Sequence, residues 1–298
     1  MAAAASWCAW LATTLAVSLG AAPSGRAEHG DPFVVPAPAS GSALPVNALL
    51  RLESHNGLAS PLPEIAAGER GYAATLVASD HRIALAPVTW WEDGEGGYGA
   101  GLLVLRPARR LRPGATYRLE LTWPDATADE IDTGWTWTAV DSVDRTPPRW
   151  TGAATTGAPL EDIPADEPVV DAGLRLEASV VEVVAELIPV GAGRRREVRL
   201  TFDATRDCDV GPTTDYTLAI FAASCPQVQP ARMCQTGYRF DADAEVGRRF
   251  RVALTAIDVA GNRRRAPGPP PMITWAGASS LTVCVPLPPA RPPPPAPP

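Results

Sequence analysis

Phe250–Asn262 has the sequence FRVALTAIDVAGN and alternates along its first eight residues. Every second position from Phe250 to Ala256 is apolar, whereas the positions between them include Arg251 and Thr255. This period of two is typical of a half-buried β-strand. The stretch then runs into Asp-Val-Ala-Gly-Asn, where Gly and Asn tolerate the positive backbone angles of a turn. The pattern therefore predicts a strand that ends in a tight turn.

A similar stretch lies 133 residues earlier, at Tyr117–Asp129, with the sequence YRLELTWPDATAD. A glycine stands three residues before the leading aromatic residue in both places, as Gly114 and Gly247. We interpret the two stretches as one structural unit that is used twice. The gapless alignment pairs four further identical residues: Arg118/Arg251, Leu121/Leu254, Thr122/Thr255 and Asp125/Asp258.

Short alternating or β-branched segments, separated by Gly, Pro, Asn and Asp, recur along the rest of the chain. Such spacing favours an all-β sandwich or barrel over alternating βαβ units. Val180–Leu187 is ambiguous, because Glu182 and Glu186 would also suit one helix face; we predict a strand. In the first half Val46–Leu52 begins the first domain, and we expect strands at Tyr72–Ala78, Ile83–Trp91, Gly101–Arg106, Tyr117–Trp123 and Trp135–Val140. In the second half we expect Leu174–Val181, Val183–Pro189, Glu197–Asp203, Tyr216–Ala222, Gly237–Ala242, Phe250–Ile257 and Ile273–Trp275 or Leu281–Val285.

Three motifs resemble segments of bacterial Ig-like and fibronectin type III-like domains. Leu111–Leu121, LRPGATYRLEL, resembles a segment whose aromatic residue lies at a sheet corner, and Tyr117 matches that residue. Asp144–Pro148, DRTPP, is similar to the joint that introduces the next such domain, and Ala256–Asn262 is similar to the end of a late strand. The resemblance covers about a fifth of the chain after its first 27 residues. It implies two tandem Ig-like antiparallel β-sandwiches, which usually serve as spacers, adhesion modules or stalks.

The expected organisation has five parts, of which the terminal segments follow from composition and the two sandwiches from the resemblance. Residues 1–27 include an apolar run of sixteen, Trp7–Ala22, followed by small residues. This favours a cleaved export signal over a retained anchor, with cuts possible after Ala22 or Ala27. We expect a flexible lead-in at 28–45, a first sandwich at 46–143, a second at 144–285 and a Pro-rich disordered tail at 286–298.

Four cysteines follow the expected signal: Cys208, Cys225, Cys234 and Cys284. In an exported chain an even number indicates two disulfides, with three possible connectivities. We prefer Cys225–Cys234 as a local link and Cys208–Cys284 as a long one. A metal site is the alternative, although no C-x-x-C spacing is present.

The net charge of −7 is concentrated in the first half: residues 28–146 carry −7 and residues 147–298 carry −1. An acidic chain lacks the basic surface typical of nucleic-acid binders. All 26 basic residues are arginines. They cluster at Arg106–Arg112, Arg194–Arg196 and Arg263–Arg265, where they could meet acidic envelope polymers or simply face water.

The search for catalytic residues finds three histidines, His29, His55 and His81, and none lies in a catalytic motif. We therefore expect no enzyme. An enzyme at the domain interface, with His81 beside carboxylates in a pocket, remains an alternative.

Two acidic groups could supply the six to eight oxygens that calcium prefers. They are Asp203, Asp207 and Asp209, and Asp241, Asp243 and Glu245 with Asp258 and Asn262 nearby. Neither completes a calcium-loop motif, so water-facing turn carboxylates are the alternative and we expect no cofactor.

Tryptophans are the remaining candidates, because exposed aromatic rings can stack on sugars. Trp135 and Trp137 share one strand face, and either Trp90 or Trp91 must face outward on a regular strand. We thus expect an exported, non-enzymatic interaction or spacer protein of the bacterial envelope, whose partner is an envelope protein or polysaccharide. A carbohydrate-binding module that uses Trp91, Trp135 and Trp137 is the alternative function.

Overall fold

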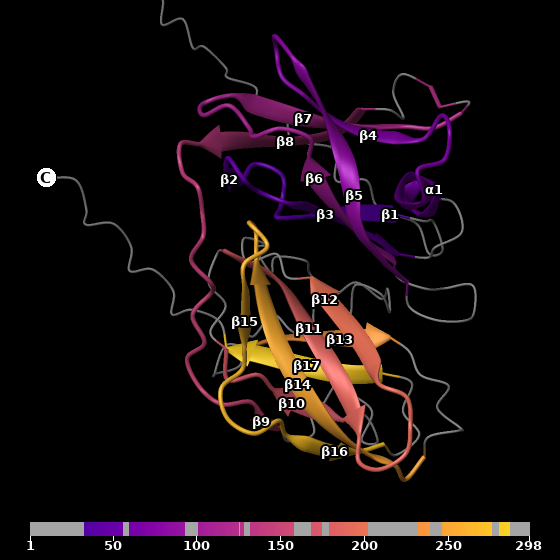
Figure 1. Cartoon of the computed structure of the whole chain (residues 1–298), viewed down its shortest axis with the longest axis vertical. Helices are drawn as coiled ribbons and strands as arrows, with labels where there is room; N and C mark the ends of the chain where they lie inside the picture. The colour runs from indigo at the N-terminus through magenta and orange to yellow at the C-terminus, as the bar shows by residue number, and fades with distance from the viewer. Residues whose placement is uncertain are drawn as a thin grey trace, which may run out of the picture.

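A computed structural model describes residues 33–55, 60–92, 101–124, 126–127, 132–157, 168–174, 179–201, 232–238, 246–275 and 280–286. These residues form strands and one short helix, so the described chain is all-β (Figure 1). No helix among them is both long and apolar enough to cross a membrane. The expected export signal and Pro-rich tail lie outside the described residues, apart from Pro286.

The N-terminal strand group is one continuous hydrogen-bonded sheet in the order β1-β3-β6-β5-β4-β7-β8-β2. Strand β5 pairs with β4 through Arg82–Leu85 and with β6 from Leu85 onward, with a register shift between Pro87 and Thr89. Because β5 changes its partner along its length, the sheet folds back on itself. The strands are β1 (Phe33–Ala37), β2 (Ala43–Pro45), β3 (Leu50–His55), β4 (Ala73–Val77), β5 (Arg82–Glu92), β6 (Gly101–Pro107), β7 (Thr116–Thr122) and β8 (Asp132–Val140).

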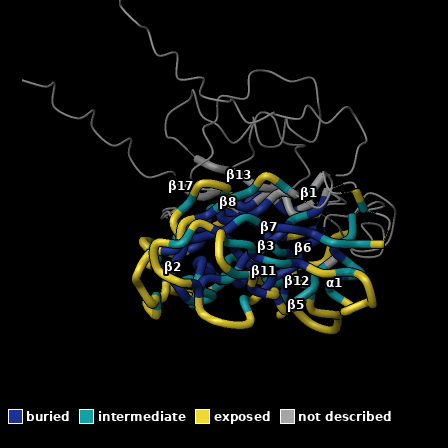
Figure 2. The backbone as a smooth tube through the Cα atoms, turned by 90° about the horizontal axis from the view of Figure 1, so that it is seen from above, coloured by how far each residue is buried: buried dark blue, intermediate teal, exposed yellow. Residues whose placement is uncertain are grey.

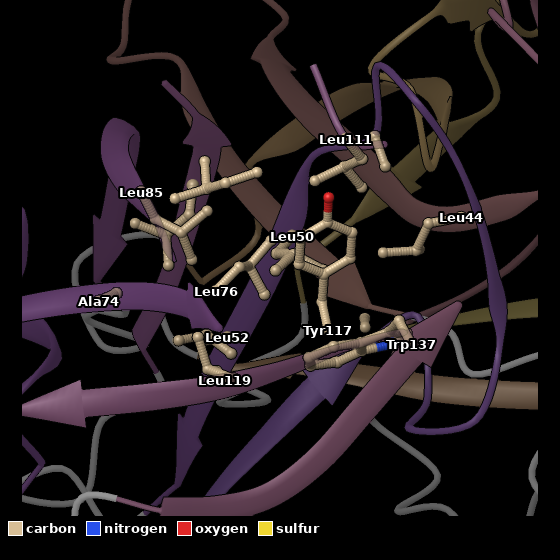
Figure 3. Close-up of a cluster of buried hydrophobic side chains, with 14 of the residues drawn as sticks. Leu44, Leu50, Leu52, Ala74, Leu76, Leu85, Leu111, Tyr117, Leu119 and Trp137 are labelled. Atoms are coloured by element: carbon tan, nitrogen blue, oxygen red, sulfur yellow. The ribbon is translucent and has the colours of Figure 1, made fainter. Parts of the chain in front are cut away.

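A hydrophobic core fills the space between the two halves of this folded sheet. Leu50 and Leu52 of β3 pack with Leu76 of β4, and Tyr117 and Trp137 lie on β7 and β8 beside them (Figure 3). All five are at most 1% exposed. Figure 2 shows the buried strands inside and the exposed loops at the periphery.

The C-terminal strand group has two sheets, in the orders β13-β17-β10-β9 and β12-β11-β14-β15, with β16 pairing β14. Its core contains residues from both, including Phe250 of β14 and Val283 of β17. The strands are β9 (Thr155–Thr156), β10 (Val169–Asp171), β11 (Val180–Pro189), β12 (Arg196–Thr201), β13 (Arg232–Tyr238), β14 (Arg249–Asp258), β15 (Arg263–Arg265), β16 (Met272–Thr274) and β17 (Ser280–Pro286).

The two related sequence stretches form equivalent structures in the two groups. The aromatic residue begins a buried face on β7 and on β14, as the alternation predicts. Gly114 and Gly247 have φ of 77° and 79°, a region that favours glycine. Each donates its backbone N–H over 2.7 Å to a carbonyl farther along the chain, that of Ala139 or of Trp275.

The predicted flexible lead-in at 28–45 is wrong from residue 33 onward, because β1 and β2 occupy most of it. β1 contains Pro36, which cannot donate a ladder hydrogen bond, but among the described strands β1 pairs with β3 alone and lies at the sheet edge. Proline is tolerated there. The first strand group thus begins well before residue 46.

Helix α1 (Leu62–Ala67) lies in a segment where the sequence predicted no regular element, with prolines at 61 and 63. Proline suits the first turn of a helix, where backbone N–H groups have no partner within the helix. Leu62 and Ile65, three residues apart, are both buried, and Gly68 ends the helix at φ 70°. The helical spacing of Leu62 and Ile65 did not stand out in the sequence, because prolines precede and separate these two residues.

In the second half, Val180–Pro189 is one strand rather than two, so the strand prediction for the ambiguous segment is confirmed. Of the expected strand Leu174–Val181, Leu174 joins no strand, whereas Val180 and Val181 are the first residues of β11. β13 lies earlier than the predicted Gly237–Ala242. The expected strand Tyr216–Ala222 lies outside the described residues.

Candidate functional site

Charged side chains from both strand groups meet where the lower edge of the N-terminal group faces the upper ends of β11 and β12 (Figure 1). Arg51 lies on β3 between Leu50 and Leu52, which enter the N-terminal core. Strand alternation therefore turns Arg51 away from that core. Glu182 of β11 and Arg199 of β12 face it from the other group.

The centre of this joint cluster is the carboxylate of Glu182. The Nε of Arg51 donates to Glu182 Oε2 over 2.7 Å, and the Nη1 of Arg199 donates to Glu182 Oε1 over 2.9 Å. Arg51 and Glu182 are each 1% exposed, and Arg199 is 10% exposed. Because each oxygen of the Glu182 carboxylate accepts from a charged arginine, its buried negative charge is compensated from both sides of the joint.

Two hydrogen bonds flank the cluster and also cross the joint. The hydroxyl of Thr201 on β12 donates to the carboxylate of Glu53 on β3. The indole Nε1 of Trp91 on β5 donates to the backbone oxygen of Glu197 over 3.2 Å. These contacts extend the polar joint from β3 to β5.

Apolar and backbone contacts close the opposite side of the joint. The backbone N–H of Leu49 donates to the oxygen of Val259 over 2.8 Å. Val181 and Val259 pack within the hydrophobic cluster of the N-terminal group, although they follow it in the chain. Gly261 has φ of 85°, a region that favours glycine, and a Cβ there would lie 2.7 Å from the end of the Leu49 side chain.

Asp258 closes the turn that carries Val259 to the joint. Its Oδ1 accepts from the N–H groups of Ala260 and Asn262, and its Oδ2 accepts from Asn262 Nδ2, over 2.8–2.9 Å. Burial raises the pKa of the Asp258 carboxyl, and the nearby Asp144 carboxylate acts in the same direction, against these three hydrogen bonds. Asp258 thus organises the turn between β14 and β15.

A second polar cluster surrounds Tyr117 at the corner before β7. The Tyr117 hydroxyl accepts from the backbone N–H of Arg112 over 2.8 Å and lies 3.0 Å from His81 Nε2. His81 Nδ1 is 2.6 Å from Asp80, whose other oxygen accepts from Arg112 Nη1 over 2.5 Å. These hydrogen bonds to His81 and Arg112 lower the pKa of the exposed Asp80 carboxyl.

This corner brings His81 together with a carboxylate, as the enzyme alternative required. Tyr117, however, is 0% exposed, and its hydroxyl is occupied by Arg112 and His81. A buried hydroxyl in that position cannot contact a substrate in this structure. The arrangement fixes the corner at which the resemblance placed the aromatic residue, while His81 stays partly exposed beside the Asp80 carboxylate.

The tryptophan candidates have different surroundings. Trp137 is 1% exposed, and its Nε1 donates to the backbone oxygens of Pro38 and Ala39, so it is not a surface for sugar stacking. Trp135 is half-buried against the N-terminal core. Trp91 is half-buried, and Trp90, on the same strand, packs against the core. The three predicted rings therefore do not form one exposed platform.

Most of the other predicted site residues lie outside the described residues. The calcium candidates Asp203, Asp207, Asp209, Asp241, Asp243 and Glu245, and the cysteines Cys208 and Cys225, lie outside the described residues. Within the described ranges, no three His, Cys, Asp or Glu residues are grouped so as to hold a metal ion. The arginines at 263–265 form β15 and are exposed, and those at 194 and 195 are also exposed.

No protein-family model matches the chain, and no curated protein matches it. Among solved structures, the tandem Ig repeats of Dlar align with 86% of this chain and 98% of that chain, at 9% identity and a TM-score of 0.19. That alignment is too weak to carry an argument about the fold or the function.

Sequence reasoning did not identify Arg51, Glu182 and Arg199 as site residues. A signal was present, because Arg51 interrupts the apolar run LLRL and Glu182 interrupts VVEVV. A charge inside a buried strand needs a partner. The partner could not be predicted, since Arg51 and Glu182 are 131 residues apart in the chain.

Proposed function

We propose that this chain is an exported, non-enzymatic protein of the bacterial envelope, in which two Ig-like β-sandwiches held at a fixed angle act as a spacer or interaction module. The buried Arg51–Glu182–Arg199 cluster is the observation that carries the proposal. Tandem modules that move freely relative to each other do not keep a charge cluster buried between them. A desolvated charge that loses its partner is costly, so the cluster favours one arrangement of the two groups.

Several features support the Ig-like part of the proposal. In the N-terminal group β5 passes from one half of the folded sheet to the other, and β2 runs parallel to β8, the last strand of that group. The Tyr117 hydroxyl accepts from a backbone N–H five residues upstream, as in the tyrosine corner of Ig-like sandwiches. In the C-terminal group Phe250 takes the equivalent place and meets Trp275 edge-on, with ring centroids 6.4 Å apart.

Small-angle X-ray scattering of the purified chain tests the fixed angle. We expect one arrangement of the two groups to account for the scattering, with the same maximum dimension at low and high salt. Glu182→Ala should broaden the distance distribution. Glu186→Ala, on the same strand but in an exposed ion pair with Arg195, should leave it unchanged. A broad distribution for the unmodified chain would overturn the fixed-angle proposal.

Retention on envelope fractions tests the interaction role and the alternative. We would pass the oxidised chain over envelope protein and polysaccharide, with calcium or with chelator. Binding of a protein partner that survives Trp91→Ala and Trp135→Ala supports the proposal. Binding to polysaccharide that either substitution abolishes would replace it with a carbohydrate-binding function, because these two tryptophans are only half-buried.

A further inference from the structure

Strand β17, the last in the described part of the chain, pairs antiparallel with β13 over seven residues, and this pairing places two cysteines directly opposite each other. Cys234 of β13 is the partner of Cys284 of β17 in the register. The neighbouring partners are Met233 with Val285 and Gln235 with Val283, so the pairing is continuous on both sides. The register therefore brings together two cysteines that are 50 residues apart in the sequence.

Backbone geometry at such a position suits a disulfide. Directly opposite residues of an antiparallel pair have Cα atoms about 4.5 or 5.5 Å apart, depending on the hydrogen-bonding pattern. Both distances fall within the range of about 4.4–6.8 Å found across disulfides. Directly opposite residues also share one face of the sheet, so no movement of the strands is needed.

The same register places the pair on the face of the sheet away from the core. Leu281 and Val283 of β17 are both 0% exposed and belong to the C-terminal core. Successive strand residues belong to opposite faces, so the position next to Val283 belongs to the other face. A bond there would not disturb the packing of Leu281 and Val283.

We infer that Cys234 and Cys284 form a disulfide that fixes β17 to β13. This differs from the pairing preferred from spacing alone, Cys225–Cys234 with Cys208–Cys284, and leaves Cys208 and Cys225 as the second pair. Formation removes two protons and two electrons from the two thiols. In the test below, glutathione disulfide accepts them and becomes two glutathione molecules. The inference rests on strand register and is independent of the proposed function.

Trypsin digestion distinguishes the possible connectivities, because cleavage after arginine divides the four cysteines among three peptides. Cleavage after Arg206, Arg232 and Arg239 places Cys208 and Cys225 together on peptide 207–232 and Cys234 alone on 233–239. Cleavage after Arg265 places Cys284 on peptide 266–298, since Arg291 precedes proline. The full chain, oxidised with glutathione disulfide, would be alkylated, digested without reductant and analysed by mass spectrometry.

We expect peptide 233–239 linked only to 266–298, and peptide 207–232 with an internal disulfide. Both other connectivities would join all three peptides into one species, which would overturn the inference. Alkylated Cys234 and Cys284 after oxidation would also overturn it. As a control, Cys208→Ser with Cys225→Ser should retain the two-peptide species, whereas Cys234→Ser should abolish it. Because the linked peptides are detected directly, a change in overall stability does not obscure the result.

Discussion

At the scale of single residues, Asp258 is a buried carboxylate that three hydrogen bonds hold in place. We expect Asp258→Ala to lower the free energy of unfolding by about 1–3 kcal/mol, because the N–H groups of Ala260 and Asn262 lose their acceptor. Asp258→Asn should cost less, since its amide oxygen can still accept from both. Chemical denaturation of the two variants at pH 7 measures the difference. Equal losses would show that the hydrogen bonds are not what Asp258 contributes.

The raised pKa of Asp258 also predicts a pH dependence. A carboxyl whose pKa is higher in the folded chain binds its proton more tightly there, so protonation favours folding. The stability of the unmodified chain, relative to Asp258→Asn, should therefore rise as the pH falls from 7 through the folded pKa. The difference should level off below the ordinary value of 3.8. Denaturation curves for both chains between pH 7 and 3 measure it, and a falling difference would contradict the assignment.

Tyr117 contributes a buried hydroxyl that accepts from the Arg112 N–H and contacts His81. We expect Tyr117→Phe to cost about 0.5–1.5 kcal/mol, the net value of a typical hydrogen bond. Tyr72→Phe is the matched control, because the described residues provide no hydrogen bond to the Tyr72 hydroxyl; it should change stability by less than about 0.5 kcal/mol. Denaturant midpoints at one pH give both values. A neutral Tyr117→Phe would remove the corner hydrogen bond as a source of stability.

At the scale of elements, β17 lies between β10 and β13 in its sheet. Leu281 is 0% exposed, so we expect Leu281→Ala to cost about 2–5 kcal/mol through lost burial and the cavity left behind. Met272→Ala on β16 is the control: Met272 is 48% exposed, and a change of about 0.5 kcal/mol or less is expected. Thermal or chemical denaturation compares them. Similar small losses would mean that β17 adds little to the C-terminal core.

Strands were predictable where alternation was strong, as in β7 and β14. There the apolar residues lie in the core, and Arg249 and Arg251 are exposed. β1 and α1 were missed because proline occurs within both and was taken as a sign of loop or turn. An edge strand and a first helical turn both tolerate proline. Local sequence did not show which of these environments applied.

The candidate site was harder to predict because its members are distant in sequence. The period of two placed Trp135 and Trp137 on one face, but whether that face is covered depends on Pro38 and Ala39, far earlier in the chain. The same holds for Arg51, whose partner lies in the other strand group. Pattern analysis identifies which side a residue faces, whereas the partner on that side is determined by the tertiary fold.

At the scale of the whole molecule, Glu182 links the two strand groups through Arg51. We expect Glu182→Ala to cost about 3–5 kcal/mol, because it leaves the buried Arg51 uncompensated. Glu186→Ala, on the same strand, loses only an exposed ion pair with Arg195 and should cost about 0–1 kcal/mol. Chemical denaturation measures both. Arg51→Met combined with Glu182→Leu should recover most of the loss, since it removes both buried charges and leaves Arg199 paired with Glu197 at 2.7 Å.

Recovery in the double variant would show that the penalty of Glu182→Ala comes from an unpaired charge at the joint, and not from poor packing on β11. The double-mutant cycle through Arg51→Met and Glu182→Leu then isolates the coupling between the two strand groups. If the two single losses simply add, Arg51 and Glu182 do not act as a pair. The angle between the groups would then depend on the contacts of Leu49 with Val259 and Gly261, which the cycle leaves intact.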